Sequence, residues 1–317
     1  MPGPPLTRPD VLVLAGGGTL GEAWMTGLLA GIEDAGGLNL SQTECFVGTS
    51  AGSIVAARLA AGTSLRRPRS IQHAVDPDAP AGAIHPDLLP AASASAEPGA
   101  LDWLERTAGQ VLAPIIRPAL RLERRPGEML RSGVLAILPD GTRSLGELEH
   151  AIERDHGRFD GRLRIVGVDR RSGRRVVFGA PGAPPASVAQ AVVASCSIPG
   201  YFHPIEIAGR EYVDGGVWSM TNLDAAPVGR RTELLCLNPI RGLPVAPISK
   251  LGLASLAGRA RESLELALVR SRGARVRTIG PAPAAARLMA PNLMDPGPRE
   301  AVLHAGYAQG LALGRAD

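Results

Sequence analysis

Aromatic residues and lysines are scarce in this chain of 317 residues. Aromatic side chains make up 3% of the sequence, and Lys250 is its only lysine, so arginine carries nearly all of the positive charge. The formal net charge of +4 is compatible with an anionic membrane surface or with nucleic acid. Platforms for nucleic acid combine basic runs with interleaved aromatic residues, and this chain has no such run. We therefore expect no nucleic-acid partner.

The three cysteines are too few and too irregular for a disulfide framework. Cys45, Cys196 and Cys236 lie in apolar stretches, and their spacing fits no metal-binding pattern. An odd number of cysteines without a pattern indicates buried, reduced thiols. The sequence therefore predicts no metal site at these residues.

Long hydrophobic runs are missing as well. No apolar stretch reaches the roughly 18 residues that are needed to span a bilayer. The first residues, 1–5, lack the basic stretch followed by an apolar stretch that is typical of a secretory signal. We expect a cytoplasmic protein, with peripheral contact at the membrane surface as a further candidate.

The organisation of the chain predicts one large domain with an insertion. Residues 1–9 form a Pro-rich tail, and residues 10–317 are interpreted as a single α/β domain. Within the domain, residues 64–145 lose the regular pattern at first, and we expect a lid or cap there. The basic amphipathic stretch 111–125 predicts either contact with lipid headgroups or a packed helix with a solvated arginine face.

Buried strands and helices alternate at the start of the domain. The apolar run Val11–Ala15 is typical of a strand covered on both faces, and a helix is predicted from about Thr19 to Ala35. A second strand, Cys45–Val47, precedes a small and apolar helix over Ser53–Ala61. This β-α-β-α order is the repeating unit of a doubly wound, mainly parallel sheet.

Further elements are predicted downstream. A capping-box pattern at Ser144 predicts a helix that runs to about Asp155. Strand patterns occur at 163–168 and 176–178, a helix at 187–194, a hairpin that ends at Asp214, and a buried strand at 234–237. The remainder is interpreted as mainly helical at 248–272 and 299–313, with a connector at 281–298.

A G-x-S-x-G motif follows the second strand. Its residues are Gly48, Thr49, Ser50, Ala51 and Gly52. This motif is typical of a nucleophile elbow, in which the serine lies on a strained strand-to-helix turn with its hydroxyl exposed. The glycines tolerate the tight backbone and keep Cβ atoms away from the packed strand and helix. The motif alone indicates a candidate serine hydrolase.

A glycine-rich block, residues 16–21, follows the first strand. Its G-x-G-x-x-G form is also typical of a dinucleotide-binding fold. That fold needs an acidic residue at the end of the second strand, whereas Glu44 lies at the beginning. The context favours an oxyanion hole, in which backbone N–H groups of Gly16, Gly17 and Gly18 stabilise a tetrahedral oxyanion. Because both motifs follow successive parallel strands, they emerge at the same edge of the sheet.

A nucleophilic serine needs a base. The chain order of α/β-hydrolases requires a histidine near the C-terminus, and only His304 is placed for that role, while His203 precedes a proline near the candidate site. Asp214 is the stronger candidate, because it ends a strand and the following Gly215 and Gly216 let the backbone approach closely. Asp-Gly-Gly by itself is more often a turn.

Together these blocks resemble the patatin-like phospholipase family, relatives of cytosolic phospholipase A2. The resemblance rests on the order and spacing of four blocks, which lie at 16–21, 48–52, 194–202 and 214–216. It covers about residues 10–62 and 187–228. The family's fold implies a three-layer α/β/α hydrolase with a mainly parallel central sheet.

The resemblance also implies a role for each motif. Ser50 is then the nucleophile, Asp214 its base, and Gly16–Gly18 the oxyanion donors of a lipid acyl hydrolase. Such a dyad needs no histidine, metal or cofactor, and its substrate is a phospholipid or another acyl lipid. Two alternatives stay open. The same acyl-enzyme could transfer its acyl group to an alcohol or lysolipid, or the chain could be a lipid-binding or regulatory protein with a catalytically weak site.

Two positions depart from the family pattern. Leu20 occupies the place where members usually carry arginine or lysine, and the lost charge would weaken the electrostatic support of an oxyanion or a phosphate. The segment Asn222–Asp224 lacks the proline of the usual Asn-x-Pro. We expect Leu20 to mark the main difference between this chain and its relatives.

Overall fold

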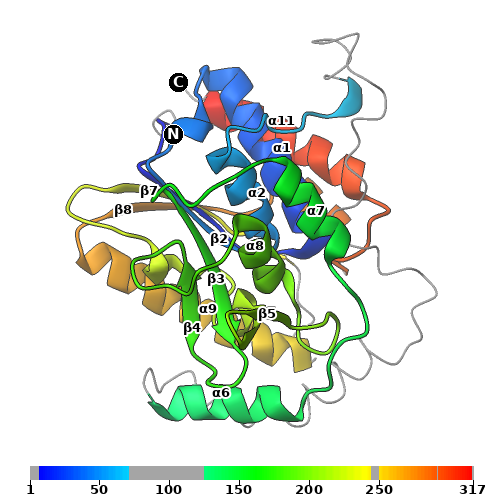
Figure 1. Ribbon diagram of the computed structural model, residues 1–317. Coiled ribbons are helices and arrows are strands. Elements are labelled where there is room, and N and C mark those ends of the chain that lie inside the picture. The colour runs from blue at the N-terminus through cyan, green and yellow to red at the C-terminus, as the bar shows by residue number, and fades with distance from the viewer. Residues whose placement is uncertain (1–6, 71–124, 244–249, 291, 316–317) are drawn as a thin grey trace.

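A mixed sheet lies between two layers of helices in the computed structural model, which describes residues 7–70, 125–243, 250–290 and 292–315 (Figure 1). Its eight strands follow the order β5-β6-β3-β2-β1-β7-β8, with β4 paired to β3. The strands are β1 (Val11–Leu14), β2 (Cys45–Thr49), β3 (Leu163–Asp169), β4 (Arg175–Phe178), β5 (Ile205–Ile207), β6 (Arg210–Asp214), β7 (Glu233–Leu237) and β8 (Arg275–Ile279). The predicted fold class is confirmed.

The register of the strands brings the sequence motifs to one edge. β3, β2, β1, β7 and β8 run parallel, and Leu14 at the end of β1 lies opposite Gly48 of β2. The glycine-rich block and the elbow therefore emerge side by side, as predicted. β6 runs antiparallel to β3 and ends where Asp214 lies opposite Gly167, one residue beyond the pair of Val166 with Thr49. This register places the aspartate level with the elbow.

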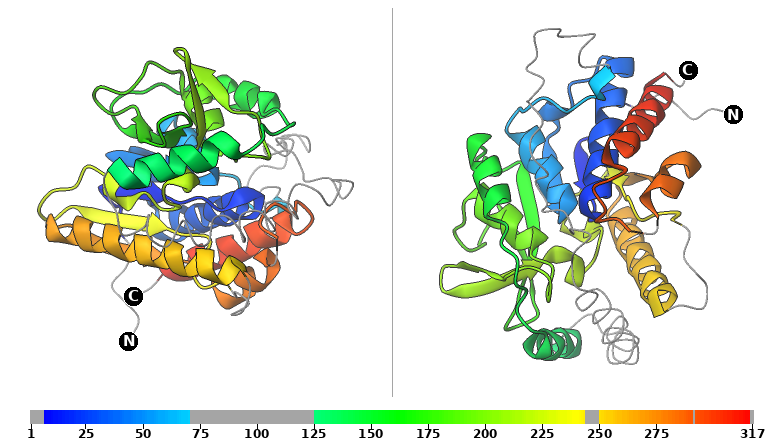
Figure 2. Two further views of the ribbon diagram at one scale, coloured as in Figure 1. Left: turned by 90° about the horizontal axis from the view of Figure 1, so that it is seen from below. Right: turned by 90° about the vertical axis from the view of Figure 1, so that its right-hand side faces the viewer.

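Alternate residues of the strands face two separate hydrophobic cores. In β1, Leu12 and Leu14 face one core, while Val11 and Val13 face the other. The helices of the first layer are α1 (Gly18–Gly36), α2 (Ala51–Ala60), α7 (Gly146–Arg154), α8 (Val188–Cys196), α10 (Pro283–Met289) and α11 (Arg299–Gly314). The opposite face is covered by α9 (Lys250–Ser271) and α6 (Arg125–Ile137) (Figure 2). A strand covered on both faces is what the apolar run of β1 predicts.

α1 and α11 pack main chain against main chain. A Cβ atom built on Gly27 of α1 would lie 2.1 Å from the carbonyl oxygen of Leu303. One built on Gly310 of α11 would lie 2.1 Å from the carbonyl oxygen of Leu28. Because no side chain fits at these positions, glycine alone allows the contact. α11 thereby fixes α1, the helix that follows the glycine-rich block.

The predicted capping box is wrong in its position. Ser144 Oγ accepts a hydrogen bond from the N–H of Gly146 at 3.1 Å, and α7 starts there with Leu145 as its N-cap. A capping box forms instead at α8, where Ser187 and Gln190 exchange side-chain to backbone hydrogen bonds. The Ser-x-x-Glu pattern thus identifies a helix start but not the residue that caps it.

Outside the predicted lid, the strand β8 and the helix α10 are absent from the sequence-based prediction. β8 has the sequence Arg-Val-Arg-Thr-Ile and lies at the edge of the sheet, where most of its side chains are at least partly exposed. It therefore lacks the apolar run that identifies the central strands. α10 is a short helix of seven residues that begins at Pro283, inside the predicted Pro/Ala connector.

Much of the predicted lid lies outside the described residues. This is true of residues 71–124, and hence of nearly all of the amphipathic stretch 111–125. The lid region ends with α6 and the segment before α7, and α6 packs Leu135 against Val168 and Val213 of the sheet. In the described parts of the chain, no helix is both long enough and apolar enough to cross a bilayer.

The cysteines are buried and free, as predicted. Burial raises the pKa of the Cys45 thiol to about 11 and also raises the pKa values of Cys196 and Cys236. The thiolate is the reactive form of cysteine. These three side chains are therefore poor nucleophiles at neutral pH and do not compete with a reactive serine.

Candidate active site

Ser50 forms the turn between β2 and α2. Its backbone has φ 50° and ψ −125°, a conformation that residues other than glycine adopt rarely and under strain. A Cβ on Gly52 would lie 2.0 Å from the carbonyl oxygen of Leu14, and one on Gly48 would lie 2.5 Å from Cα of Ser53. The elbow has the predicted strand-turn-helix form, and its glycines are required by close backbone contacts.

The buried side chain of Ser195 binds the backbone of the elbow. The N–H of Ser50 donates to Ser195 Oγ at 2.8 Å, and Ser195 Oγ donates to the carbonyl oxygen of Val166 at 2.6 Å. The Ser53 hydroxyl donates to the carbonyl oxygen of Ser50 at 2.6 Å. These bonds satisfy both backbone groups of the strained residue. The role of Ser195 was not predicted, and its place in the block at 194–202 is the only sequence signal for it.

Asp214 lies beside the elbow, close enough for the Ser50 side chain to lower the pKa of its carboxyl group. Its Oδ1 also accepts the N–H of Gly216 at 2.6 Å. The residue is 5% exposed, and burial raises the pKa of its carboxyl to about 6, although the Gly216 N–H and the Ser50 side chain lower it. At neutral pH Asp214 is therefore mostly ionised, yet basic enough to accept a proton.

The glycines after Asp214 allow the close approach that the sequence predicts. A Cβ on Gly215 would lie 2.3 Å from the carbonyl oxygen of Val166 in β3. A Cβ on Gly216 would lie 2.9 Å from Sδ of Met220 and 3.0 Å from Oδ1 of Asp214. Any larger residue at these positions would push the aspartate loop away from the sheet.

Asn222 connects the aspartate loop to the elbow. Its Nδ2 donates to Thr49 Oγ1 at 3.1 Å and to the carbonyl oxygen of Gly215 at 3.3 Å. Its Oδ1 accepts from Arg175 Nη1 at 3.3 Å, and Arg175 is paired with Asp224. The side chain of Asn222 thus holds the residue before the nucleophile and the residue after the base in one network.

Two backbone N–H groups of the glycine-rich block differ from the third in their hydrogen bonding. Among the described residues, none accepts a hydrogen bond from the N–H of Gly17, the N-cap of α1, or from that of Gly18. The N–H of Gly16 differs, because it donates to the carbonyl oxygen of Met220 at 2.9 Å. The N-terminal end of the α1 dipole adds positive potential at the free amides. Of the three predicted oxyanion donors, Gly16 therefore already has an acceptor, and Gly17 and Gly18 stay predictions.

Leu20 is fully buried in the core beneath α1. The charged group nearest in sequence is Glu22, which pairs with Arg299 of α11 at 2.7 Å. Burial raises the pKa of Glu22, but the positive charge of Arg299 and, to a smaller extent, of Arg66 brings it below the ordinary value. The first turns of α1 therefore carry a compensated ion pair two residues after Leu20.

The two histidines that were considered as bases have exposed side chains. His304 lies on the outer side of α11, and His203 lies at the surface before β5. Ser50 and Asp214, by contrast, are 7% and 5% exposed. The structure therefore brings an aspartate, and neither of these histidines, to the serine.

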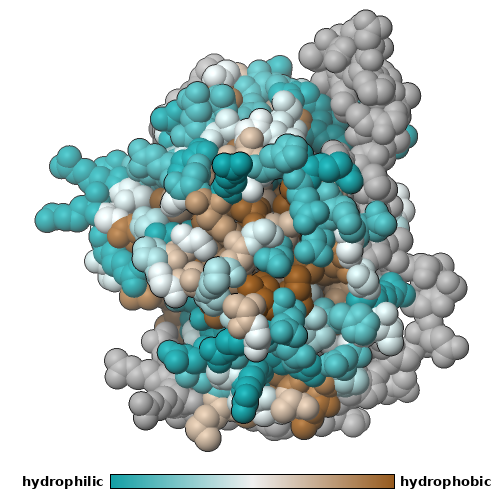
Figure 3. All heavy atoms as spheres, viewed as in Figure 1, coloured by the Kyte–Doolittle hydropathy of each residue, from teal (hydrophilic) through white to brown (hydrophobic). Residues whose placement is uncertain are grey.

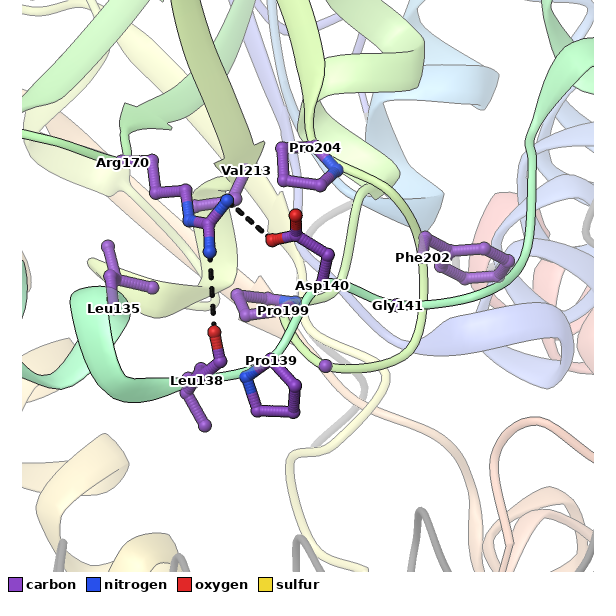
Figure 4. A pocket seen from close by; sticks show the side chains of 11 residues that line it. Leu135, Leu138, Pro139, Asp140, Gly141, Arg170, Pro199, Phe202, Pro204 and Val213 are labelled. Atoms are coloured by element: carbon purple, nitrogen blue, oxygen red, sulfur yellow. Dashed lines mark hydrogen bonds and ion pairs between the residues drawn. The ribbon is translucent and has the colours of Figure 1, made fainter.

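A small cavity lies between the end of α6 and the segment after α8 (Figure 4). Leu135, Phe202 and Val213 line it, together with an ion pair of Arg170 with Asp140 at 2.6 Å. The cavity has room for about one water molecule. It is too small to hold an acyl chain and does not serve as a substrate pocket in this conformation.

Apolar surface gathers on the face over α8 and β5, framed by polar residues (Figure 3). Ile198, Tyr201 and Ile205 are partly exposed in this region and pack on the core beneath. The segment that holds the elbow through Ser195 thus carries apolar side chains on its outer side. Apolar surface of this kind is common where proteins meet lipids or other proteins.

A profile of the patatin-like phospholipases matches residues 12–227, more than half of the chain. The chain belongs to the patatin-like phospholipase family. The matched range includes the glycine-rich block, Ser50 and Asp214. Membership supports a lipid acyl hydrolase activity in general terms.

Two solved structures are similar to this chain. VipD from Legionella pneumophila is 16% identical with a TM-score of 0.41, and the match covers 98% of this chain and 67% of VipD. A chain of the ExoU–SpcU complex from the type III secretion system of Pseudomonas aeruginosa is 24% identical with a TM-score of 0.33, with coverage of 86% and 56%. This chain thus spans about two thirds of one relative and just over half of the other. No curated protein matches it.

Proposed function

We propose that this protein is a serine lipid acyl hydrolase of the phospholipase A type, with Ser50 as nucleophile and Asp214 as general base. The observation that carries the proposal is the position of the Ser50 side chain beside the buried Asp214 carboxyl group, whose pKa it lowers, at a strained elbow. A carboxylate within hydrogen-bond reach of a serine hydroxyl is placed to remove its proton as the oxygen attacks.

The reaction then has two halves. Ser50 Oγ attacks the ester carbonyl while Asp214 takes its proton, and the N–H groups of Gly17 and Gly18 stabilise the oxyanion. The alcohol leaves with the proton from Asp214, and Ser50 keeps the acyl group. Asp214 next removes a proton from water, the hydroxide attacks the acyl-enzyme, and the fatty acid is released as Ser50 regains its proton. No metal or cofactor takes part in this scheme.

The proposed substrate is a phospholipid or another acyl lipid. The proposed location is the cytoplasm, with peripheral contact at a membrane. The apolar surface over α8 and β5 supports such contact (Figure 3). Transfer of the acyl group to an alcohol in place of water would use the same dyad, and product analysis with added lysolipid distinguishes the two.

The first test uses a fluorophosphonate probe together with hydrolysis of p-nitrophenyl butyrate. We expect the probe to label Ser50 in the wild type, and we expect Ser50→Ala to lose both labelling and turnover. Ser263→Ala is the matched control, because Ser263 is exposed on α9 and should behave like the wild type. Equal turnover by the wild type and Ser50→Ala would exclude the proposed nucleophile. Folded wild type without labelling or turnover would favour a lipid-binding protein.

The second test is the pH profile of kcat/KM. Asp214 acts as a base only when it is ionised, and its pKa is raised to about 6. Turnover should therefore rise with pH through about 6, level off above 7, and fall about tenfold for each unit below the pKa. The rate measured from pH 4.5 to 8 checks this. A flat profile across pH 5 to 7 would contradict the assignment of the base.

A further inference from the structure

Met220 lies between the two glycine motifs of the site. A Cβ on Gly16 would lie 2.7 Å from Met220 Cε and 3.4 Å from Cβ of Ser50. On the other side, a Cβ on Gly216 would lie 2.9 Å from Met220 Sδ and 3.0 Å from Oδ1 of Asp214. The thioether of Met220 therefore fills the space beside Ser50 and Asp214, between the glycine-rich block and the aspartate loop.

This position puts the Met220 side chain next to a dyad that is almost closed to solvent. Ser50 and Asp214 are 7% and 5% exposed, although a substrate carbonyl has to reach Ser50 Oγ. We propose that the Met220 side chain is a gate that swings aside to admit the ester and limits the bulk tolerated next to the scissile carbonyl. The inference rests on the proposed function and adds the acyl groups that the site accepts, namely unbranched ones.

The main chain around Met220 is fixed. The Met220 carbonyl oxygen accepts the N–H of Gly16, and the next residue, Thr221, donates its hydroxyl to buried Glu265 at 2.6 Å. Asn222 is bound to Thr49. A shift of the backbone would break these buried hydrogen bonds. Buried polar groups that lose their partners destabilise the folded state, so such a shift is unfavourable. The opening motion is therefore a rotation of the side chain.

Methionine suits such a rotation because it is unbranched and has several rotatable bonds. The neighbouring residues also leave room for this rotation, because Gly16 and Gly216 carry no side chain. When the thioether turns away, it frees a channel of about its own cross-section. A straight acyl chain has that cross-section, whereas a carbonyl with three methyl groups on its α-carbon is wider. The geometry therefore favours straight-chain esters.

The test compares p-nitrophenyl butyrate with p-nitrophenyl trimethylacetate on the full chain. Met220→Ala should raise the kcat/KM ratio of trimethylacetate to butyrate by about tenfold to a hundredfold, the range in which pocket volume discriminates between substrates. It should also speed the labelling of Ser50 by a fluorophosphonate. Met220→Leu, with similar volume and a shorter reach, should keep the wild-type ratio. Met129→Ala, at an exposed methionine of α6, is the matched control and should leave both readouts unchanged.

Four outcomes would decide against the gate. An unchanged ester ratio and labelling rate in folded Met220→Ala would overturn it and leave the dyad standing. An equal gain in Met129→Ala would attribute the effect to general loosening. Failure of the probe to label Ser50 in the folded wild type and in Met220→Ala would overturn the proposed function and the gate together. Should Met220→Ala not fold, Met220→Val tests a smaller loss of volume at the same position, and an unchanged ratio there would also overturn the gate.

Discussion

Asp214→Asn is expected to lower kcat/KM for ester hydrolysis by about 10²–10⁴-fold, the usual contribution of a general base, and at the same time to stabilise the fold. Burial raises the pKa of Asp214 from 3.8 to about 6, so at pH 8 the folded state holds a charge that it disfavours. One pKa unit corresponds to about 1.4 kcal/mol, and the neutral amide should raise the free energy of unfolding by about 2–3 kcal/mol. Chemical denaturation at pH 8 measures this gain.

The gain should depend on pH in a defined direction. Because the folded-state pKa of Asp214 is raised, its protonated form contributes stability that is complete below about pH 4 and is lost as the pH rises through about 6. The difference between Asp214→Asn and the wild type should therefore be largest above pH 7 and close to zero near pH 4. Denaturation curves at pH 4, 6 and 8 check the trend.

Asp295→Asn is a matched control for this prediction. Asp295 Oδ1 accepts the N–H of Gly297 at 2.9 Å, which is the same local bond that Asp214 makes with Gly216. Its side chain is exposed, so replacement of the carboxylate should change stability by less than about 0.5 kcal/mol. A loss of stability in Asp214→Asn at pH 8 would contradict the argument that the buried negative charge of Asp214 destabilises the folded state.

Gly310→Ala is expected to destabilise the fold by about 3 kcal/mol or more. In a helix interior this change normally stabilises by up to about 1 kcal/mol, because alanine is the better helix former. Here the new Cβ would lie 2.1 Å from the carbonyl oxygen of Leu28, and neither backbone can yield without separating α11 from α1. Overpacking against main chain is among the costliest substitutions in a core. Thermal or urea unfolding measures the loss.

Gly133→Ala provides the opposite expectation from the same change. Gly133 is exposed within α6, and among the described residues no atom outside the backbone of its own helix turn lies within 4 Å of its Cβ position. We expect this variant to be more stable than the wild type by about 0.5–1 kcal/mol. Similar effects of the two substitutions would mean that the contact between α1 and α11 is looser than the structure shows. Ester hydrolysis should fall in Gly310→Ala, because displacement of α1 would move Gly18, its first residue and a proposed oxyanion donor. It should stay unchanged in Gly133→Ala.

The central strands and the convergence of the motifs could be predicted from the sequence. β1 and β2 are short apolar runs that each end in a glycine-rich turn, and the parallel order of such units dictates that their ends meet. The meeting of Ser50 with Asp214 could be inferred only through the family resemblance, because more than 160 residues separate them. The two side chains lie close enough for Ser50 to lower the pKa of Asp214, whereas their roles as nucleophile and base stay predictions.

Other features depend on contacts that leave no local pattern. Ser195 holds the elbow from 145 positions away, and a buried serine looks the same in sequence whether or not it has a partner. Met220 gains its significance from the two glycines on either side of it, which are distant in the chain. Gly16 fits the pattern of an oxyanion donor, yet its N–H is taken by a carbonyl that only the tertiary structure supplies. Such pairings are decided by packing.

The sheet needs strands that lie beyond the residues matched by the family profile. The family match ends at residue 227, whereas β7 begins at Glu233 and pairs with β1 in the middle of the sheet. A fragment that stopped at 227 would keep every motif of the site but would leave β1 as an open edge and α1 without α11. Expression trials that trim the chain to the matched range should therefore yield aggregated protein, and the shortest useful fragment has to include α11.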